Sequence, residues 1–319
     1  MQIITSHNFR HPGKGFIATV GMFDGVHKGH RYLIELLRHL GEENDYEPLV
    51  VTFVNHPFTI VKSSSSPSLL SSVSERLRLI EKAGVNKCLL LEFTEELRKM
   101  SAFEFISFLK REFNVKGLLA GFNHRFGSDH DSSPFNLEES ASRAGVNFYR
   151  GMEYSFNSSM KISSSHIRRL ISKTDVEEAS DLLGHPYELT GKVSEGRKIG
   201  RSIGFPTANL TPIVSEKIIP GNGVYATMAR IDDENGLILP AMVNIGFNPT
   251  VSDQKISSIE AHLIGLPQGT NLYRHIITLY FYKFIRQEEK FESLEDLKKR
   301  LSLDRQTTIE NLKTKILMP

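Results

Sequence analysis

The sequence predicts an α/β domain followed by a β domain, and two observations carry this fold class. In the first half, apolar strand-like runs alternate with segments of helical periodicity, the order that gives a parallel sheet covered by helices. After Leu183-Gly184-His185-Pro186, short strand-like runs follow one another with turn residues between them, a spacing typical of a small barrel. We therefore expect one domain over residues 1–181 and a second over 182–319.

Four short apolar runs in the first domain predict strands of a parallel sheet: FIATV (16–20), PLVVTFV (48–54), KCLLLEF (87–93) and VKGLLA (115–120). Three intervening segments have apolar residues at helical spacing: 31–40, 74–83 and 101–113. Ser74 is the expected cap of the second of these helices, which ends near Gly84.

Five runs in the second domain predict strands: YELTGKV (187–193), GVYATMARI (223–231), LILPAMVNI (237–245), SIEAHLI (258–264) and HIITLYFYKFI (275–285). Asn235-Gly236 is a favourable hairpin turn between the second and third runs. A closing helix follows, with Ser293 as its cap and Leu294, Leu297 and Leu301 on one face.

The composition excludes several classes of protein. The net charge of +2 is too small to indicate nucleic-acid binding, and no apolar run approaches the ~18 residues of a membrane span. The single cysteine, Cys88, excludes an internal disulfide and a cysteine-based zinc site, and its apolar run predicts a buried thiol. The first residues lack the form of a secretion signal. Together these features predict a cytoplasmic protein.

The segment Gly21–His30, GMFDGVHKGH, lies between the first predicted strand and the first predicted helix. Ligands of open α/β sheets bind at this end of the strands, where glycines and a helix start can approach a phosphate. His27 and His30 are three residues apart, so both can face one anion. That arrangement suits adenylyl transfer, which needs orientation and charge neutralisation rather than a general base. The alternatives are a glycine-rich turn with surface histidines and a zinc pair, for which no third ligand is evident.

The second domain has no P-loop but carries a basic, glycine-containing segment over residues 196–209. Thr207 and Asn209 are two residues apart, so in an extended chain their oxygens lie on one side. Hydroxyl and amide oxygens suit Mg²⁺. A solvated turn is the alternative on chemistry alone.

Both segments resemble motifs of the bacterial bifunctional riboflavin kinase/FAD synthetases. In the first domain the matching motifs are GMFDGVHKGH (21–30), TFVNHP (52–57), GFNHRFG (121–127) and ISSSHIR (162–168). In the second they are GFPTAN (204–209), GVYA (223–226), NIGFNPT (244–250), IEAH (259–262) and FIRQEEKF (284–291). The resemblance covers the chain from about Val20 to Asp304. It implies a Rossmann-like nucleotidyltransferase domain followed by a six-stranded β-barrel riboflavin kinase domain with a C-terminal helix.

The resemblance also implies roles in the first domain. It assigns catalysis of adenylyl transfer to His27, His30 and Arg168. The implied ATP-binding residues are Gly21, Phe23, Asp24, Gly29, Ser163, Ser164 and Ser165. The implied FMN-binding residues are His56, Pro57 and Asn123.

In the second domain the resemblance makes Glu260 the catalytic base. The acceptor is a primary hydroxyl of very high pKa, and a positioned carboxylate can take its proton as the new bond forms. In a strand Glu260 and His262 face the same side; a surface carboxylate is the alternative. The implied ATP-binding residues are Gly196, Lys198, Gly204, Pro206, Thr207 and Asn209, of which Thr207 and Asn209 also bind the metal. Arg286 and Glu288 are the implied flavin-binding residues.

The predicted function is FAD biosynthesis: riboflavin is phosphorylated by ATP to FMN in the second domain, and FMN is adenylylated to FAD in the first, with release of pyrophosphate. Both steps need a divalent cation, expected to be Mg²⁺. The expected partners are the small molecules ATP, riboflavin and FMN, with no nucleic acid and no membrane; homo-oligomerisation is left open.

Three departures from the family pattern bear on this prediction. Ser128-Asp129-His130-Asp131 stands where a basic residue and a glycine are usual, and its two acids would repel phosphate. Asn55 replaces a common proline, and Tyr273-Arg274 replaces a common Tyr-Gly. The first departure motivates a rival function, a monofunctional riboflavin kinase with an impaired adenylyltransferase domain. Two further rivals are a flavin-binding regulatory protein without turnover, and a cytidylyl- or pantetheine-type transferase fused to an unrelated barrel.

Overall fold

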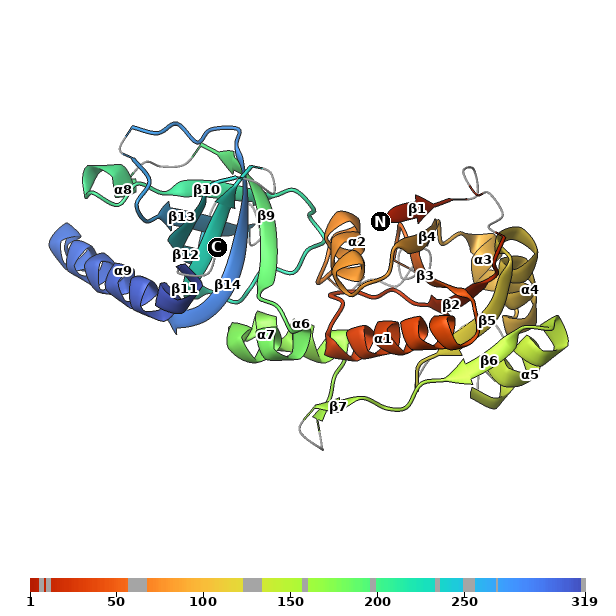
Figure 1. Cartoon of the computed structure of the whole chain (residues 1–319). Helices are drawn as coiled ribbons and strands as arrows, with labels where there is room; N and C mark the ends of the chain where they lie inside the picture. The colour runs from red at the N-terminus through yellow and green to blue at the C-terminus, as the bar shows by residue number, and fades with distance from the viewer. Residues whose placement is uncertain are drawn as a thin grey trace. The chain divides into compact units, whose positions relative to one another are not determined.

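A computed structural model describes residues 1–5, 9, 13–56, 68–122, 134–156, 160–195, 199–232, 236–248, 256–267 and 269–316 (Figure 1). The chain divides into two compact units. The first comprises Met1–Pro67 and Ser71–Ser163, and the second comprises Ser68–Leu70 and Ser164–Pro319. The second unit includes helices α6 (Ser164–Ser172) and α7 (Val176–Leu183), because α6 packs on α7 and α7 packs on barrel strands. The expected domain boundary at residue 182 stays a prediction.

The first unit is built on a parallel sheet with the strand order β1-β4-β3-β2-β5-β6 in the described ranges. The strands are β1 (Gln2–Ile4), β2 (Phe16–Val20), β3 (Glu47–Phe53), β4 (Lys87–Leu91), β5 (Val115–Ala120) and β6 (Asn147–Arg150). The helices are α1 (Lys28–Glu43), α2 (Val73–Lys82), α3 (Glu95–Lys99), α4 (Ala102–Phe113) and α5 (Pro134–Ala144), and a hairpin joins β7 (Ser155–Phe156) to β8 (Met160–Lys161). All four predicted strands are confirmed; the added strands β1 and β6 are short edge strands.

The helices of this unit cover both faces of the sheet, as expected of a parallel sheet. On one face α1 and α2 pack through Ile34, Leu37 and Ile80. On the other, α4 and α5 pack through Phe105 and Ala141. The neighbouring strands β2 and β5 are therefore followed by helices on opposite faces, α1 and α5. Such a reversal leaves a crevice at the carboxyl ends of the two strands.

Two details of this unit test the sequence predictions. Cys88 is a free, fully buried thiol whose pKa is raised to about 12 by burial, so the prediction of a buried thiol is confirmed. The prediction that Ser74 caps α2 is wrong, because Ser72 caps it. The Ser72 hydroxyl accepts from the Glu75 N–H and the Glu75 carboxylate accepts from the Ser72 N–H. This reciprocal pair needs Glu three residues after Ser, a spacing that Ser72 has and Ser74 lacks.

The second unit is a closed barrel of antiparallel strands in the order β10-β13-β12-β11-β14-β9, closed by pairing of β9 with β10. The described strands are β9 (Tyr187–Ser194), β10 (Ala208–Pro212), β11 (Gly223–Ile231), β12 (Ile238–Asn248), β13 (Ile256–Leu263) and β14 (Ile276–Arg286). The predicted fold class, an α/β domain followed by a six-stranded barrel with a terminal helix, is confirmed. The predicted turn at Asn235 lies outside the described residues.

Two register shifts between β11 and β14 shape the end of the barrel. Strict alternation from Leu279 and Phe281 would turn Lys283 into the barrel. Instead the Phe284 ring packs edge-on against Tyr225, and Lys283 forms an ion pair with Glu177 of α7. Bulges of this kind re-aim side chains at barrel rims.

The closing helix α9 (Leu294–Ile316) packs against β11, β12 and β14. Ser293 caps it, since the Asp296 N–H donates to the Ser293 hydroxyl at 3.1 Å, which confirms the predicted cap. The face predicted from Leu294 is only partly correct, because Leu294 is 62% exposed. The fully buried row of α9 is Asp304, Thr308 and Leu312, four residues apart in each step. Within the described ranges, no helix combines the length and apolar character needed to span a membrane.

Candidate active sites

The loop between β2 and α1 holds unusual backbone conformations. Phe23, Gly25 and Val26 have φ values of 49°, 78° and 39°, in the left-handed region that side-chain-bearing residues rarely adopt. The buried Asp24 carboxylate accepts from the Ser71 N–H at 2.9 Å and from the Ser71 hydroxyl at 3.1 Å. The same hydroxyl accepts from the Gly25 N–H at 2.9 Å. Strained loops persist only where their surroundings hold them, and here Ser71 supplies those contacts.

The structure brings His27 and His30 together at the start of α1. Their rings stack with centroids 3.7 Å apart and an interplanar angle of 13°. His27 is the N-cap of α1, and its Nδ1 accepts from the His30 N–H at 3.3 Å. An accepting Nδ1 leaves the proton of the neutral ring on Nε2. Burial lowers the pKa of His27 to about 4, so this ring is a neutral donor at pH 7.

Phe23 and Gly29 lie against the histidine pair, and Gly21 lies against Phe23. The Gly21 N–H donates to the carbonyl of Val51 at 3.0 Å, and the buried Phe23 ring lies 5.0 Å from the His30 ring. A Cβ on Gly29 would stand 3.3 Å from the His27 ring. These residues shape the surroundings of the two histidines, and their predicted contact with ATP stays a prediction, as does that of Asp24.

Asn55, a departure from the family pattern, has a clear structural role. Its amide donates to the Phe93 carbonyl at 2.9 Å and its amide oxygen accepts from the Phe93 N–H at 2.8 Å. The side chain thereby continues the β3–β4 pairing beyond the strand ends. Half-buried His56 follows it. Pro57, Asn123 and the segment Ser128–Asp131 lie outside the described residues, so their predicted roles stay predictions.

Ser163, Ser164 and Ser165 lie at the start of α6, with Arg168 one turn further along. Ser163 and Ser165 are exposed and Arg168 is half-buried. The N–H groups and the dipole of a helix start favour an anion. The chain thus presents hydroxyls and a guanidinium at one helix end, and their predicted binding of phosphate stays a prediction.

Three predicted site residues of the barrel, Asn209, Glu260 and Arg286, lie in one cross-strand row, which we call the register row. Each member pairs directly with the next on the adjacent strand. Directly paired residues of antiparallel strands point to the same side of the sheet. The register row runs through Ser194, Asn209, Glu260, Asn244, Val224 and Arg286. Strand register alone therefore gathers residues that are up to 92 positions apart in the sequence (286 − 194).

A cavity of about 260 Å³ opens on this row. Its lining includes the polar residues Thr207, Asn244 and Glu260 and the apolar residues Met242, Leu297 and Leu301. The Thr207 hydroxyl donates to Glu260 Oε2 over a long 3.4 Å. Half-buried Glu260 is thus flanked by Asn209 and Asn244 on the neighbouring strands, and by Thr207.

His262 lines the same cavity as Glu260, which confirms that the two residues share a side of β13. Its Nδ1 lies 2.8 Å from the Pro206 carbonyl, and its ring lies 5.3 Å from that of Phe205. Burial lowers the pKa of His262, which favours the neutral ring. Gly204 has a φ of 88°, a conformation that favours glycine. Gly196 and Lys198 lie outside the described residues, so their predicted roles stay predictions.

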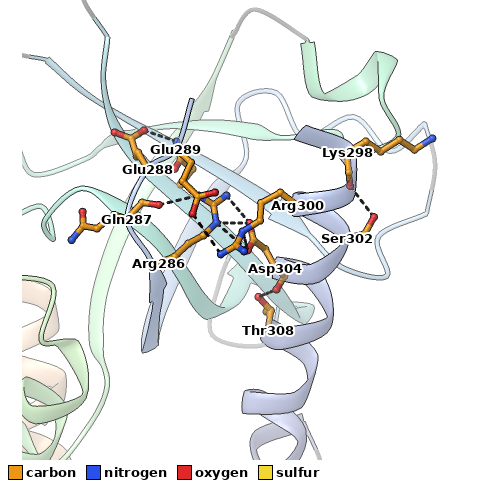
Figure 2. A network of polar contacts seen from close by, with 10 residues as sticks. Arg286, Gln287, Glu288, Glu289, Lys298, Arg300, Ser302, Asp304 and Thr308 are labelled. Atoms are coloured by element: carbon orange, nitrogen blue, oxygen red, sulfur yellow. Dashed lines mark hydrogen bonds and ion pairs between the residues drawn. The ribbon is translucent and has the colours of Figure 1, made fainter. Parts of the chain in front are cut away.

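The predicted flavin residues, Arg286 and Glu288, line the cavity. Sequence reasoning missed the contacts that hold them there. Arg286 pairs with Asp304 of α9 (Figure 2). The Glu288 carboxylate accepts from the Asn244 amide at 3.2 Å. Asn244 lies in the motif NIGFNPT, which is a signal that could have pointed to it. Asp304 carries no such signal, because a carboxylate on a charged helix is indistinguishable from a solvated one in sequence.

Comparison with known proteins gives the same two-part division. The FAD synthetase family model matches residues 10–166, and the riboflavin kinase family model matches residues 183–312. The bifunctional riboflavin kinase/FMN adenylyltransferase of Escherichia coli K12 is 32% identical over 94% of this chain and 93% of its own. The protein of the same name from Haemophilus influenzae is 31% identical over 96% and 98%.

A crystal structure described as a macrolide-efflux protein from Streptococcus pneumoniae has the same fold, with a TM-score of 0.84 and 27% identity. It covers 96% of this chain and 98% of its own. Both domains of the bifunctional enzymes are present here, which supports the main prediction rather than the monofunctional kinase. The chain belongs to the family of bifunctional riboflavin kinase/FMN adenylyltransferases.

Proposed function

We propose that this chain makes FAD in two ATP-dependent steps: riboflavin kinase activity in the barrel and FMN adenylyltransferase activity in the unit with the parallel sheet. The observation that carries the proposal is the register row. It sets a carboxylate, Glu260, between two amides beside a cavity that both polar and apolar side chains line. Riboflavin has a matching character, with an apolar ring system and a polar ribityl chain.

In the kinase step, the Glu260 carboxylate takes the proton of the terminal ribityl hydroxyl as its oxygen attacks the γ-phosphorus of ATP. The new O–P bond forms while the bond from the γ-phosphorus to the bridging oxygen breaks, and ADP leaves. The Thr207 hydroxyl orients the carboxylate through their hydrogen bond. A general base of this kind contributes roughly 10²- to 10⁴-fold to the rate.

Thr207 and Asn209 are the residues that would hold the divalent cation, which we propose is Mg²⁺. Asn209 pairs with Glu260, and Thr207 donates to it, so the donor set consists of hard oxygen ligands. In the described part of the chain no three His, Cys, Asp or Glu residues form a metal site. A cation at Thr207 and Asn209 would also be bound by the nucleotide phosphates. The cation would neutralise charge on the transferring phosphoryl group.

In the adenylyl step, a phosphate oxygen of FMN attacks the α-phosphorus of ATP and pyrophosphate leaves. Because the His27 ring is neutral at pH 7, it contributes a hydrogen-bond donor rather than a full charge. The family resemblance assigns the fixed positive charge of this step to Arg168 and its hydroxyl donors to the serines at the start of α6. We place the reaction in the cytoplasm, a setting that agrees with a single, buried and free cysteine.

The test is a product assay on the purified chain with riboflavin and Mg-ATP, followed by chromatography. We expect FMN to form first and FAD to follow, and FMN supplied alone with Mg-ATP to give FAD. FMN without FAD would support a monofunctional kinase. Neither product, with riboflavin still bound, would support a flavin-binding protein without turnover. Omitting Mg²⁺ and adding EDTA is the control for the cation.

A further inference from the structure

Asp304 is a buried carboxylate in a position where an apolar residue is expected. It begins the inward-facing row of α9 and is 1% exposed. Four and eight residues later, Thr308 and Leu312 are fully buried, and Leu312 packs against Ala226 and Met228 of the barrel. A helix that lies on a barrel normally buries apolar side chains along such a row. A buried carboxylate without a partner costs several kcal/mol.

The partner of Asp304 is Arg286, the last residue of β14. Arg286 Nε donates to the two carboxylate oxygens at 3.1 and 3.0 Å, and Nη2 donates to Oδ2 at 2.7 Å. The side chains are 9% and 2% exposed. Arg300 lies on the outer side, its Nε 3.4 Å from Asp304 Oδ1 and its Nη2 3.7 Å from Glu289 (Figure 2). A bidentate pair fixes the plane of the guanidinium.

The Arg286–Asp304 ion pair is better explained by the geometry that it imposes than by the stability that it contributes. Buried ion pairs contribute little net stability, and apolar residues of similar volume often stabilise a protein equally well. What an apolar pair cannot do is hold the end of β14 through directed bonds. Arg286 Nη1 donates onward to the Gln287 carbonyl at 2.9 Å, so the guanidinium also fixes the backbone just after the strand.

Glu288 connects the chain after Arg286 to the part of the cavity that Glu260 lines. Its carboxylate accepts from the Asn244 amide at 3.2 Å, and Asn244 pairs directly with Glu260. The carboxylate also lies over Gly246, where a Cβ would displace it. Arg286, Glu288 and Glu260 all line the cavity.

We propose that Asp304 is a positioning residue for riboflavin phosphorylation, an inference that rests on the proposed kinase function. By holding Arg286, Asp304 fixes the segment 286–291, of which Arg286 and Glu288 line the cavity. The nucleotide motif lines the same cavity through other residues, Phe205 and Thr207. Because the family resemblance assigns Arg286 and Glu288 to the flavin, we expect Asp304 to act on the flavin substrate more than on ATP.

The first test is Asp304→Asn, which removes the charge and keeps the shape. We expect the KM for riboflavin to rise about tenfold, equivalent to about 1.4 kcal/mol of binding. The kcat and the KM for ATP should stay within about threefold, and FAD formation from supplied FMN should be unchanged. Glu310→Gln is the matched control, because Glu310 is an exposed carboxylate on the same helix. Equal rises in the KM for riboflavin and for ATP, or no rise, would overturn the proposal.

A double-mutant cycle tests whether Asp304 acts through Arg286. If it does, Asp304→Asn should add less than about twofold to the riboflavin KM of Arg286→Met, whereas fully additive effects would contradict it. The double variant has no uncompensated charge at this pair. It can therefore still be compared with Arg286→Met if Asp304→Asn fails to fold. A wild-type chain that makes no FMN would sink the proposed kinase function itself. A wild-type chain that makes FMN, with variants that match it, would sink only the role of Asp304.

Discussion

The barrel and the parallel sheet position their candidate site residues in different ways. In the barrel, the pairing of adjacent strands sets Asn209, Glu260, Asn244 and Arg286 side by side. In the sheet unit, His27 and His30 follow a loop with left-handed residues, which Asp24 and Ser71 hold in place. The barrel site thus depends on regular hydrogen bonding, and the sheet site depends on a loop held by a few side chains.

This difference predicts how each site responds to amino-acid substitution. A strand position is fixed by many backbone hydrogen bonds, so substitution there should remove a chemical group and leave the geometry intact. In a loop held by side chains, one substitution can remove a chemical group and also change the geometry. Substitutions at Glu260, His30, His27 and Arg274 each test this contrast between a strand-based site and a loop-based site.

The largest effect is expected for Glu260→Gln. The amide keeps the shape of the side chain but cannot accept the ribityl proton, so FMN formation should fall by roughly 10²- to 10⁴-fold. FAD formation from supplied FMN should stay at the wild-type rate, because strand register holds the barrel unchanged. Steady-state rates of both steps measure this. Glu260 is not the base if FMN formation stays near the wild-type rate.

His30→Ala should affect the other reaction. Loss of a donor that stabilises developing charge costs roughly 100-fold, so FAD formation from FMN should fall by about that factor while FMN formation persists. His39→Ala is the matched control, since His39 is exposed on the same helix α1. Unchanged FAD formation in His30→Ala would remove this residue from the site.

His27 predicts a pH dependence of stability. Its folded pKa of about 4 lies below the ordinary 6.5, so the folded state binds fewer protons than the unfolded chain below pH 6.5. The stability that the neutral His27 ring contributes is fully present above pH 6.5 and is lost as the pH drops toward 4. Linkage gives a loss of about 2 kcal/mol at pH 5 relative to pH 8.

His27→Asn removes this titration and replaces the capping ring nitrogen of α1 with a capping amide oxygen. We therefore expect urea unfolding of the variant to lose about 2 kcal/mol less than wild type between pH 8 and pH 5. Parallel pH profiles for the two proteins would show that the His27 ring accepts a proton freely in the folded state.

The smallest effect is expected for Arg274→Gly in the barrel. Arg274 has a φ of 71°, where a side chain costs about 1–2 kcal/mol, and glycine avoids that cost but loses more entropy on folding. The net result should be a stabilisation of less than about 1 kcal/mol, read as a Tm a few degrees higher. Arg274→Lys is the control and should leave the Tm unchanged. A lower Tm for Arg274→Gly would contradict the strain argument.

Much of the fold followed from sequence because its signals are local. The apolar runs of β2 to β5 and of the long barrel strands are periodic and bounded by turn residues, so their positions were predictable. β1 and β6, three and four residues long, carry too little pattern to be seen. The five-residue strand β10 was expected only as an extended segment, since its motif drew attention to chemistry rather than structure.

The candidate sites were predictable as motifs but not as contacts. Glu260, Thr207 and His262 were named from sequence, and the structure brings them to one cavity. The stacking of His27 on His30, the pairing of Asn55 with Phe93, and the burial of Asp304 were not foreseen. The histidine stacking follows a loop with left-handed residues, and the pairing of Asn55 with Phe93 joins residues 38 positions apart. The burial of Asp304 depends on which side of α9 meets the barrel. Local periodicity predicts none of these.

The register row also limits how this sequence can change in length. A substitution in the row removes one group, but an inserted or deleted residue turns every later side chain of that strand to the opposite face. In β13 such a change would move Glu260 out of the cavity and bring an apolar neighbour, Ile259 or Ala261, into its place. We therefore expect relatives that differ in length to carry their insertions in the connections between strands, with β10 to β14 unchanged in length between the row and the nearest turn.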